Sequence, residues 1–374
     1  AAGRWTSARG ASDPVDPSVA DMPQLVARLV ARYGSAATPT GIHAYALDNE
    51  PALWFQNHPR LMPGRVTIAS FIARSVSAAR AIKTIDPAAR IFGPASWGAT
   101  GMVSFQDAPD WDRYRGYGSF IAAYLDAFRR ASDQAGQRLL DTLDVHWYPF
   151  HEAGNLFRSE RPELEPAMLE APRSLTEPGF REKSWVPQAF RASAAHGLGL
   201  PILPSLTRLI ERWYPGTALA VSEFNYGGAG RLAAGLALAD VLGRYCAAGV
   251  GYACHWGSLE GWLGEAYRLY RQPDASGGCF GGHLLPVVGS LPPTVSAYAS
   301  SAGGIHRLIL INKADEPVQL DVAFATDRPR HPVSIWGFDA QAGATIPFDR
   351  FGTWTSNGWR LDVPPRAARR YDFG

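Results

Sequence analysis

In the stretch HAYALDNEPALWF, residues 43–55, an apolar segment is followed directly by the polar residues Asp48, Asn49 and Glu50. Residues 42–47 are expected to form a buried strand, and the DNEP that follows places Glu50 where the chain leaves it. A second stretch, ALAVSEFNYGG at residues 218–228, ends its apolar segment at Glu223 in the same way. In folds with parallel strands, ligands bind where strands end and loops begin. Both glutamates are therefore predicted to lie on one functional face of a sheet.

Alternating helix-like and strand-like segments surround these stretches from residue 21 to about residue 256. Apolar residues at helical spacing predict helices over 25–33, 68–82, 120–128, 201–213, 231–248 and 261–270. Apolar segments predict strands over 42–47, 90–95, 143–148, 218–223 and 251–256. Because these strands are apolar almost throughout, the pattern predicts an α/β fold with a parallel sheet covered by helices. Long connections leave the strands at 96–117 and 149–200, and connections of this length are usually functional.

The pattern changes after about residue 275. Short segments, some of them alternating, predict strands over 295–300, 307–313, 318–324, 333–338 and 359–363. This part is expected to form a small antiparallel β-sandwich over residues 276–374, after a strand-and-helix domain over residues 1–275. The predicted linker covers residues 273–282.

Composition excludes several classes of partner. The 374 residues include 36 Lys+Arg and 34 Asp+Glu, which gives a formal net charge of +2 without long runs of one sign. The sequence therefore shows no basic cluster that would bind nucleic acid or an anionic membrane. No segment approaches the roughly 20 apolar residues of a membrane span. We therefore expect no nucleic-acid or membrane partner, and a neutral substrate is compatible. Residues 1–10 lack the apolar core of a signal peptide, so this stretch does not specify localisation.

Glu50 and Glu223 are separated by 173 positions (223 − 50) yet occupy equivalent places at strand ends. If the strands close into a barrel, side chains at these ends converge on its axis. Two convergent carboxyl groups suit glycosidic bond cleavage, one as a proton donor and the other as an ionised nucleophile or base. The alternative is that each glutamate is a solvated strand-end residue or pairs with an arginine.

Several motifs make the resemblance to a known family specific. The chain contains, in order, YALDNEPALW with HPR, FGPASWG, QDAPDW, DVHWYP, APRSL, AVSEFNYGG and YRLY followed by FG. In this it resembles glycoside hydrolase family 44, which comprises endoglucanases and xyloglucanases. The resemblance covers nearly the whole chain. It implies a (β/α)8 TIM-type barrel with a C-terminal β-sandwich, of which strands 4 to 8 are visible here and the N-terminal strands are not.

The resemblance also implies an activity. Glu50 would be the acid/base and Glu223 the nucleophile of a retaining endo-β-1,4-glucanase acting on cellulose-type glucans or xyloglucan. A secreted monomer is expected from the substrate class and the family. Three alternatives stay open: a β-mannanase, a mixed-linkage glucanase, and a non-catalytic carbohydrate-binding protein that uses the same aromatic residues without turnover.

Further side chains are expected to bind substrate. The resemblance implies that Asn49 holds the sugar 2-hydroxyl. His146 and Tyr148 alternate at one strand end, so both can face the site, and Tyr148 could hydrogen-bond the nucleophile. The aromatic candidates for stacking on sugar rings, each with core packing as its alternative, are Trp54, Trp97, Tyr226 and Trp256.

No cofactor is required by this chemistry. The grouping of His146, His151 and Glu152 invites a metal interpretation, but its spacing matches no recognised ligand pattern, so no catalytic metal is predicted. A structural calcium held by the acidic loop QDAPDWD is an alternative to a solvated loop; its carboxylates are Asp107, Asp110 and Asp112.

Overall fold

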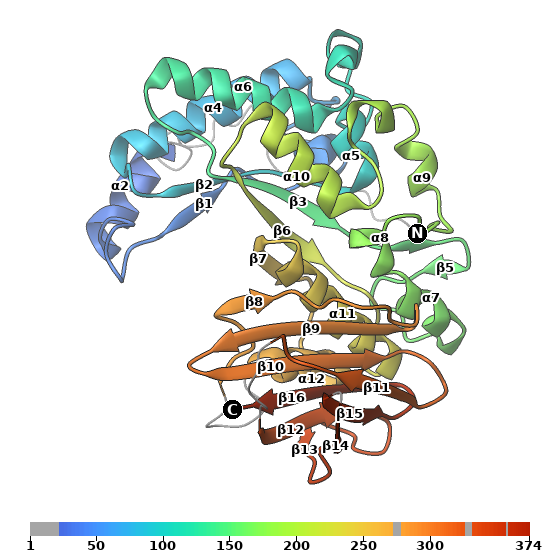
Figure 1. Cartoon of the computed structure of the whole chain (residues 1–374). Coiled ribbons are helices and arrows are strands. Elements are labelled where there is room, and N and C mark those ends of the chain that lie inside the picture. Colours follow the sequence, from blue (N-terminus) through green and yellow to red (C-terminus); the bar gives the residue numbers. More distant parts are fainter. Residues whose placement is uncertain (1–21, 272–277, 326–330, 357) are drawn as a thin grey trace. The chain divides into compact units, whose positions relative to one another are not determined.

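The computed structural model describes residues 22–271, 278–325, 331–356 and 358–374 (Figure 1). The chain divides into two compact units, which are described separately. The first contains Ala1–Trp147 and Val186–Ser222, and the second contains Tyr148–Trp185 and Glu223–Gly374. The predicted domain boundary at residues 275/276, and half of the predicted linker, lie outside the described residues, so both stay predictions.

The first unit is a parallel sheet covered by helices. Its strands are adjacent in the order β1 (Ala44–Ala46), β2 (Arg90–Ser96), β3 (Thr142–Trp147) and β6 (Ala218–Phe224), the last of which reaches the second unit at Glu223. β1 and β2, and β2 and β3, pair in parallel, as predicted. The helices of this unit are α2 (Met22–Tyr33), α3 (Trp54–Asn57), α4 (Ile68–Ile85), α5 (Gly98–Ser104), α6 (Phe120–Ala135), α9 (Val186–Ala189) and α10 (Ile202–Trp213).

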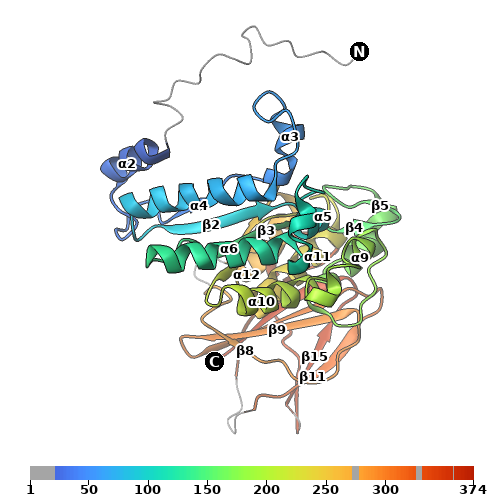
Figure 2. The same ribbon diagram turned by 90° about the horizontal axis from the view of Figure 1, so that it is seen from above.

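Local signals in the sequence explain where the main helices begin and end. Thr67 caps α4 by accepting a hydrogen bond from the Ser70 N–H, and Ser119 caps α6 by accepting one from the Ala122 N–H. Gly136 ends α6 with φ of 61°, a left-handed conformation that glycine adopts without a steric penalty. α4, α6 and α10 lie side by side over one face of the sheet (Figure 2).

An aromatic core packs α4 against α6. The ring of Phe71 on α4 lies 5.8 Å from that of Tyr124 and 6.1 Å from that of Phe120, both on α6, and 5.0 Å from that of Phe105. All four rings are buried. Burial of one large aromatic side chain contributes about 1.5 to 3 kcal/mol, so this cluster is a main source of the unit's stability.

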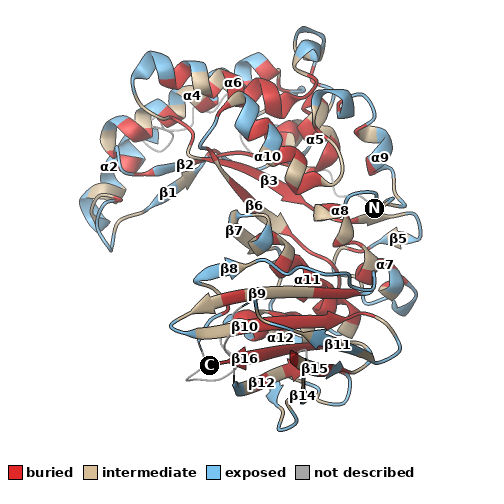
Figure 3. Cartoon of the chain, viewed as in Figure 1, coloured by how far each residue is buried: buried red, intermediate tan, exposed pale blue. Residues whose placement is uncertain are grey.

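The prediction that the first strand is buried is wrong. β1 has only three residues, of which Ala44 and Ala46 are exposed, whereas β2 and β3 are almost entirely buried (Figure 3). Within the described residues β1 pairs with β2 alone, so its other side is a sheet edge. An apolar sequence does not bury a strand that has neighbours on one side only.

The second unit begins with the long segment after β3 and continues through two long helices. This segment holds the short elements β4 (Phe150–His151), β5 (Gly154–Asn155), α7 (Glu165–Glu170) and α8 (Arg173–Thr176). The later elements are α11 (Leu232–Ala247), β7 (Val250–His255) and α12 (Gly261–Arg271). All five predicted strands of the α/β part are therefore present as β1, β2, β3, β6 and β7.

Two antiparallel sheets complete the second unit (Figure 1). The larger has the order β13 (Ile346–Pro347), β12 (Pro332–Phe338), β16 (Ala367–Phe373), β10 (Ile305–Asn312), β9 (Val295–Ala302) and β8 (His283–Leu285). The smaller has the order β11 (Val318–Val322), β15 (Gly358–Val363) and β14 (Thr353–Thr355). Residues of both sheets share one hydrophobic core, which includes Leu308, Ile335, Leu361 and Phe373.

Buried charges fix α11 to these sheets. Asp240 on α11 is fully buried and accepts hydrogen bonds from Lys313 Nζ at 2.6 Å and Arg244 Nε at 3.2 Å. The Tyr298 hydroxyl donates to the same carboxylate. Gly243, one turn along, lies where an added Cβ would be 2.2 Å from the Tyr298 ring, so only glycine permits this close approach.

No described helix has the length and apolar character that a membrane span requires.

Candidate active site

Glu50 lies in a strained turn after β1. Its φ of 43° and ψ of 55° are left-handed, and Asp48 before it has φ of 70°. The Glu50 N–H donates to the carbonyl of Ala95, which also has a positive φ, of 50°. Such conformations cost about 1 to 3 kcal/mol each for residues other than glycine and concentrate at functional sites. The following Pro51, with its fixed φ, starts the 3₁₀ turn Pro51–Leu53.

The Glu50 carboxyl group is hydrogen-bonded to an imidazole within the first unit. His146 Nδ1, at the end of β3, lies 2.8 Å from Glu50 Oε1. The imidazole is 1% exposed, whereas Glu50 is partly exposed. Either group can donate in this bond, since Nδ1 carries a hydrogen in one tautomer and accepts one in the other. The contact can therefore be kept while Glu50 gains and loses a proton, which suits a general acid/base.

Glu223 is held by a tyrosine within the second unit. The Tyr148 hydroxyl donates to Glu223 Oε2 at 2.8 Å. The Tyr148 ring packs edge-on against Phe157, with ring centroids 5.4 Å apart. A hydrogen bond from a neutral donor stabilises the ionised form of a carboxyl group, as a nucleophile requires. The structure thus confirms the predicted contact between Tyr148 and Glu223.

Asn225 is a site residue that the sequence analysis missed. It is buried and accepts hydrogen bonds from the N–H groups of Arg158 (2.9 Å) and Gly227 (3.0 Å). Its Nδ2 lies 3.2 Å from both His255 Nε2 and the Trp256 carbonyl oxygen. Burial, and to a lesser degree the charge of Arg158, lowers the pKa of His255, so the neutral imidazole that accepts from Asn225 is favoured. The period-2 alternation of a strand, which puts Asn225 on the same face as Glu223, was the available signal.

Trp256 and Trp97 are both accessible. Trp256, just after β7, is 51% exposed, and its N–H donates to the Phe224 carbonyl at 2.9 Å. Trp97, just after β2, is half-buried, and its Nε1 donates to Gln106 Oε1 at 3.0 Å. Both remain candidates for stacking on a sugar ring.

Gln106 is a second residue that the sequence analysis missed. Thr100 Oγ1 also donates to its Oε1, at 2.6 Å, so two donors fix the orientation of the amide. Gln106 and its two neighbours, Phe105 and Asp107, have φ values of 57°, 52° and 52°. This left-handed turn directs the Gln106 oxygen towards Trp97, and its composition, FQD, gives no sign of it.

Comparisons with known proteins identify the family. The family model described as glycoside hydrolase family 44 matches residues 5–151, which include Glu50 and His146. The crystal structure of Cel44A, a family 44 endoglucanase from Clostridium thermocellum, matches with a TM-score of 0.88 and 37% identity. That match covers 94% of this chain and 70% of the other. The chain belongs to glycoside hydrolase family 44.

Other relatives agree with this assignment. Endoglucanase A of Paenibacillus lautus is 38% identical over 390 residues, and the beta-mannanase/endoglucanase A of Caldicellulosiruptor saccharolyticus is 36% identical over 389 residues. These matches cover 98% and 96% of this chain but 54% and 29% of the two relatives, so the chain spans about half or less of their length. A Paenibacillus polymyxa xyloglucanase, solved with xyloglucan, matches with a TM-score of 0.86 and 34% identity, over 94% of this chain and 70% of that one.

The family 44 neighbours support a mixed α/β fold with a curled parallel sheet that forms half a barrel. The predicted family is confirmed. The roles of individual residues are not settled by the comparisons and stay predictions.

Two predicted sugar platforms of this family 44 chain are core residues instead. Trp54 is 9% exposed, packs edge-on against Phe71 with ring centroids 5.8 Å apart, and donates from Nε1 to the Asn49 carbonyl at 3.1 Å. Tyr226 is 0% exposed. An aromatic ring with so little accessible surface cannot stack on a sugar, so both residues pack in the core, as their stated alternative has it. Asn49 is exposed, and its expected contact with the 2-hydroxyl remains a prediction.

The carboxylates of the acidic loop are engaged by local partners. Both carboxylate oxygens of Asp110 accept from backbone N–H groups at the start of α4, at 2.8 and 3.0 Å. Asp112 pairs with Arg115, and Asp107 accepts from the Ser104 hydroxyl. In the part of the chain that the structure describes, neither these carboxylates nor His151 and Glu152 belong to a cluster of three metal-ligating groups. The loop carboxylates act as a helix cap and as local hydrogen-bond partners.

Proposed function

We propose that this chain is the catalytic part of a retaining endo-β-1,4-glucanase that acts on cellulose-type glucans or xyloglucan, with Glu50 as acid/base and Glu223 as nucleophile. One observation carries the proposal. His146 and Tyr148 are two residues apart, and each holds one of the two glutamates at 2.8 Å. Because alternate residues at a strand end face the same side, the two carboxyl groups would flank one bound sugar. Retention requires them to be about 5 to 5.5 Å apart.

The reaction would proceed in two displacements. Glu50, protonated, gives its proton to the glycosidic oxygen while Glu223 attacks the anomeric carbon, so the bond to the leaving sugar breaks as the glycosyl-enzyme ester forms. Glu50, now a carboxylate, takes a proton from water, whose oxygen attacks the same carbon and releases Glu223. In this scheme Tyr148 stabilises Glu223 as an anion before attack, and His146 keeps Glu50 oriented through both proton transfers.

The substrate is proposed by analogy with the relatives. The solved xyloglucanase with xyloglucan and the curated endoglucanase favour a β-1,4-glucan, and the nearly balanced charge of this chain suits a neutral polymer. The name of the second curated relative makes β-mannan the second candidate. We further propose that the complete protein is a secreted monomer whose half-barrel belongs to a closed (β/α)8 barrel, with the C-terminal sheets forming a β-sandwich.

Azide rescue of two variants would test the assignment. With an aryl β-cellobioside, whose leaving group needs little protonation, Glu223→Gly should be nearly inactive until azide attacks the vacated face and yields the α-glycosyl azide. Glu50→Ala should form the glycosyl-enzyme and yield the β-glycosyl azide instead. Full activity of either variant on polysaccharide would refute its role. Reducing-sugar release from xyloglucan, carboxymethylcellulose and mannan by the unmodified chain ranks the substrates, and binding without release would favour the carbohydrate-binding alternative.

A further inference from the structure

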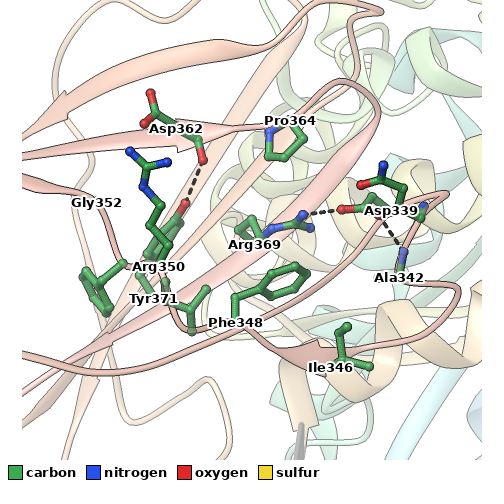
Figure 4. Close-up of a pocket in the computed structure, with 13 residues that line it drawn as sticks. Asp339, Ala342, Ile346, Phe348, Arg350, Gly352, Asp362, Pro364, Arg369 and Tyr371 are labelled. Carbon is green, nitrogen blue, oxygen red and sulfur yellow. Dashed lines mark hydrogen bonds and ion pairs between the residues drawn. The ribbon is translucent and has the colours of Figure 1, made fainter.

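A cavity lies in the C-terminal sheets, inside the second unit. It has a volume of about 450 Å³ and is formed by β12, β16, the end of β15 and the segment around β13 (Figure 4). Small-molecule sites in proteins usually measure about 300 to 1,000 Å³. Gln341 and Arg350 line it and are exposed, so it can be reached from solvent.

Aromatic side chains form the apolar side of this cavity. Phe348, Phe351 and Tyr371 line it, and Phe351 packs edge-on against Tyr371 with ring centroids 5.5 Å apart. The Arg369 guanidinium stacks over the Phe348 ring at 4.0 Å. The rings are therefore held in fixed orientations.

The buried charges of the cavity are already neutralised. Arg369 forms an ion pair with Asp339, whose other oxygen accepts from the N–H groups of Gln341 and Ala342 at 2.8 Å each (Figure 4). Burial raises the pKa of Asp339, but its hydrogen bond with Arg369 and those from the backbone outweigh this and lower it below its ordinary value. This pair shapes the wall and leaves no net charge for a ligand to balance.

Polar groups at the rim are available to a ligand. Among the described residues, the Arg350 guanidinium makes no ion pair or hydrogen bond, and the Gln341 amide makes none with its side-chain atoms. The Asp362 carboxylate is exposed and accepts from Gln319 Nε2 at 2.7 Å. The residues that line the cavity thus include one arginine and one aspartate that form no ion pair with each other in the described part of the chain.

This combination selects the class of ligand. An anion would meet Asp362, and a cation would meet Arg350, whereas a neutral ring with several hydroxyl groups can use a donor, an acceptor and an amide together. The C–H face of that ring would stack on the aromatic side chains that line the cavity. We propose that this cavity is a non-catalytic binding site for a neutral pyranose unit, and that it holds a glycosyl residue of the polysaccharide. The identity of that polysaccharide rests on the proposed function.

Hydrogen exchange on the full chain tests the site directly. With catalysis silenced by Glu223→Gln, cellotetraose and a xyloglucan oligosaccharide are added in turn, and protection is read separately at residues 346–352 and at residues 43–55. We expect protection at 346–352. Arg350→Ala should raise the oligosaccharide concentration needed for half-maximal protection about tenfold, as the loss of one hydrogen bond from a charged group would. Arg360→Ala, which removes an exposed arginine of β15 outside the cavity, is the charge-matched control and should change nothing.

The outcomes separate this proposal from the proposed function. Protection at 43–55 with none at 346–352, or protection at 346–352 that Arg350→Ala leaves intact, overturns the second site while the hydrolase proposal stands. Protection at 346–352 in a chain that hydrolyses no glucan supports the second site and overturns the proposed function. Protection at neither segment overturns the second site, and hydrolysis by the unmodified chain then decides the function on its own.

Discussion

The Tyr148 hydroxyl donates a hydrogen bond of 2.8 Å to Oε2 of Glu223, and the chain reaches Tyr148 two residues after His146, which lies 2.8 Å from Glu50 Oε1. One strand end therefore supplies a partner for each of the two glutamates. Substitution of these partners and their neighbours shows what each contributes.

Tyr148→Phe should lower kcat on a cello-oligosaccharide about 10- to 100-fold, because it removes a hydrogen bond to a charged group of about 1.5 to 3 kcal/mol and keeps the ring. The KM should change little, since the hydroxyl hydrogen-bonds Glu223, whose ionised form is needed for the chemical step. Steady-state kinetics at several pH values measures both. An unaltered kcat would mean that the hydroxyl contributes nothing to the nucleophile.

Asn225→Ala should reduce kcat/KM, because His255, Trp256 and the Arg158 backbone lose their common partner. Asn225→Asp keeps the acceptor for Arg158 and Gly227 but loses the donor, so it should recover part of the activity. The kinetics of both variants, each with its unfolding midpoint, distinguish positioning from loss of folding. Equal activity of the alanine variant and the parent would contradict a positioning role.

Gln106→Leu should raise the KM for polysaccharide, because Trp97 loses the acceptor that fixes its indole. Gln106→Glu retains an acceptor for both Trp97 and Thr100 and is the matched control. We expect the leucine variant to bind less tightly than the glutamate variant in affinity electrophoresis with xyloglucan. Equal retardation of the two by xyloglucan, each measured against its own mobility in a gel without polysaccharide, would show that this hydrogen bond does not matter for binding.

Asp240→Asn should destabilise the chain by about 3 to 5 kcal/mol at pH 7, because it leaves Lys313 buried beside an uncharged group. Burial raises the pKa of Asp240, but the charges of Lys313 and Arg244 outweigh it, so the pKa lies well below its ordinary value. A carboxylate with a depressed folded pKa stabilises the fold above its unfolded pKa, about 3.9, and loses this contribution as the pH falls further.

Urea unfolding at pH 7 and at several values below 4 should therefore show the difference between parent and Asp240→Asn shrinking with acidity. Asp315→Asn, which removes an exposed partner of Arg366, is the control and should have little effect at any pH. A difference that is constant with pH would contradict the account of this buried pair.

The sequence predicted the strand-and-helix order well, because helical and strand periodicities are local properties. The position of a glutamate at the end of two strands could also be predicted, since Glu50 and Glu223 each follow an apolar segment. The exposure of β1 could not be predicted, because burial depends on what lies beside a strand. Trp54 and Tyr226 were misplaced for the same reason, since an aromatic residue near a loop can point into the core.

The strand β16 was missed because its sequence, AARRYDF, has two arginines at its centre. Arg370 is nonetheless fully buried, bonded to Asp372 and to the carbonyls of Leu269 and Gly278. The two carbonyl partners come from α12 and the residues after it, so no local pattern reveals them. The left-handed turn at Gln106 could not be predicted either, because the side chain of Arg65, which is distant in the sequence, helps to hold it by donating to the Gln106 carbonyl.

Covalent trapping tests the central claim most directly. A 2-deoxy-2-fluoro-β-cellobioside with an activated leaving group forms the glycosyl-enzyme but releases it slowly, because the fluorine destabilises the positive charge that develops at the anomeric carbon. We predict one label per chain, which peptide mass spectrometry locates on Glu223. A label on any other residue, or release of an α-configured first product from an unlabelled active enzyme, would contradict the assignment of Glu223 as the nucleophile.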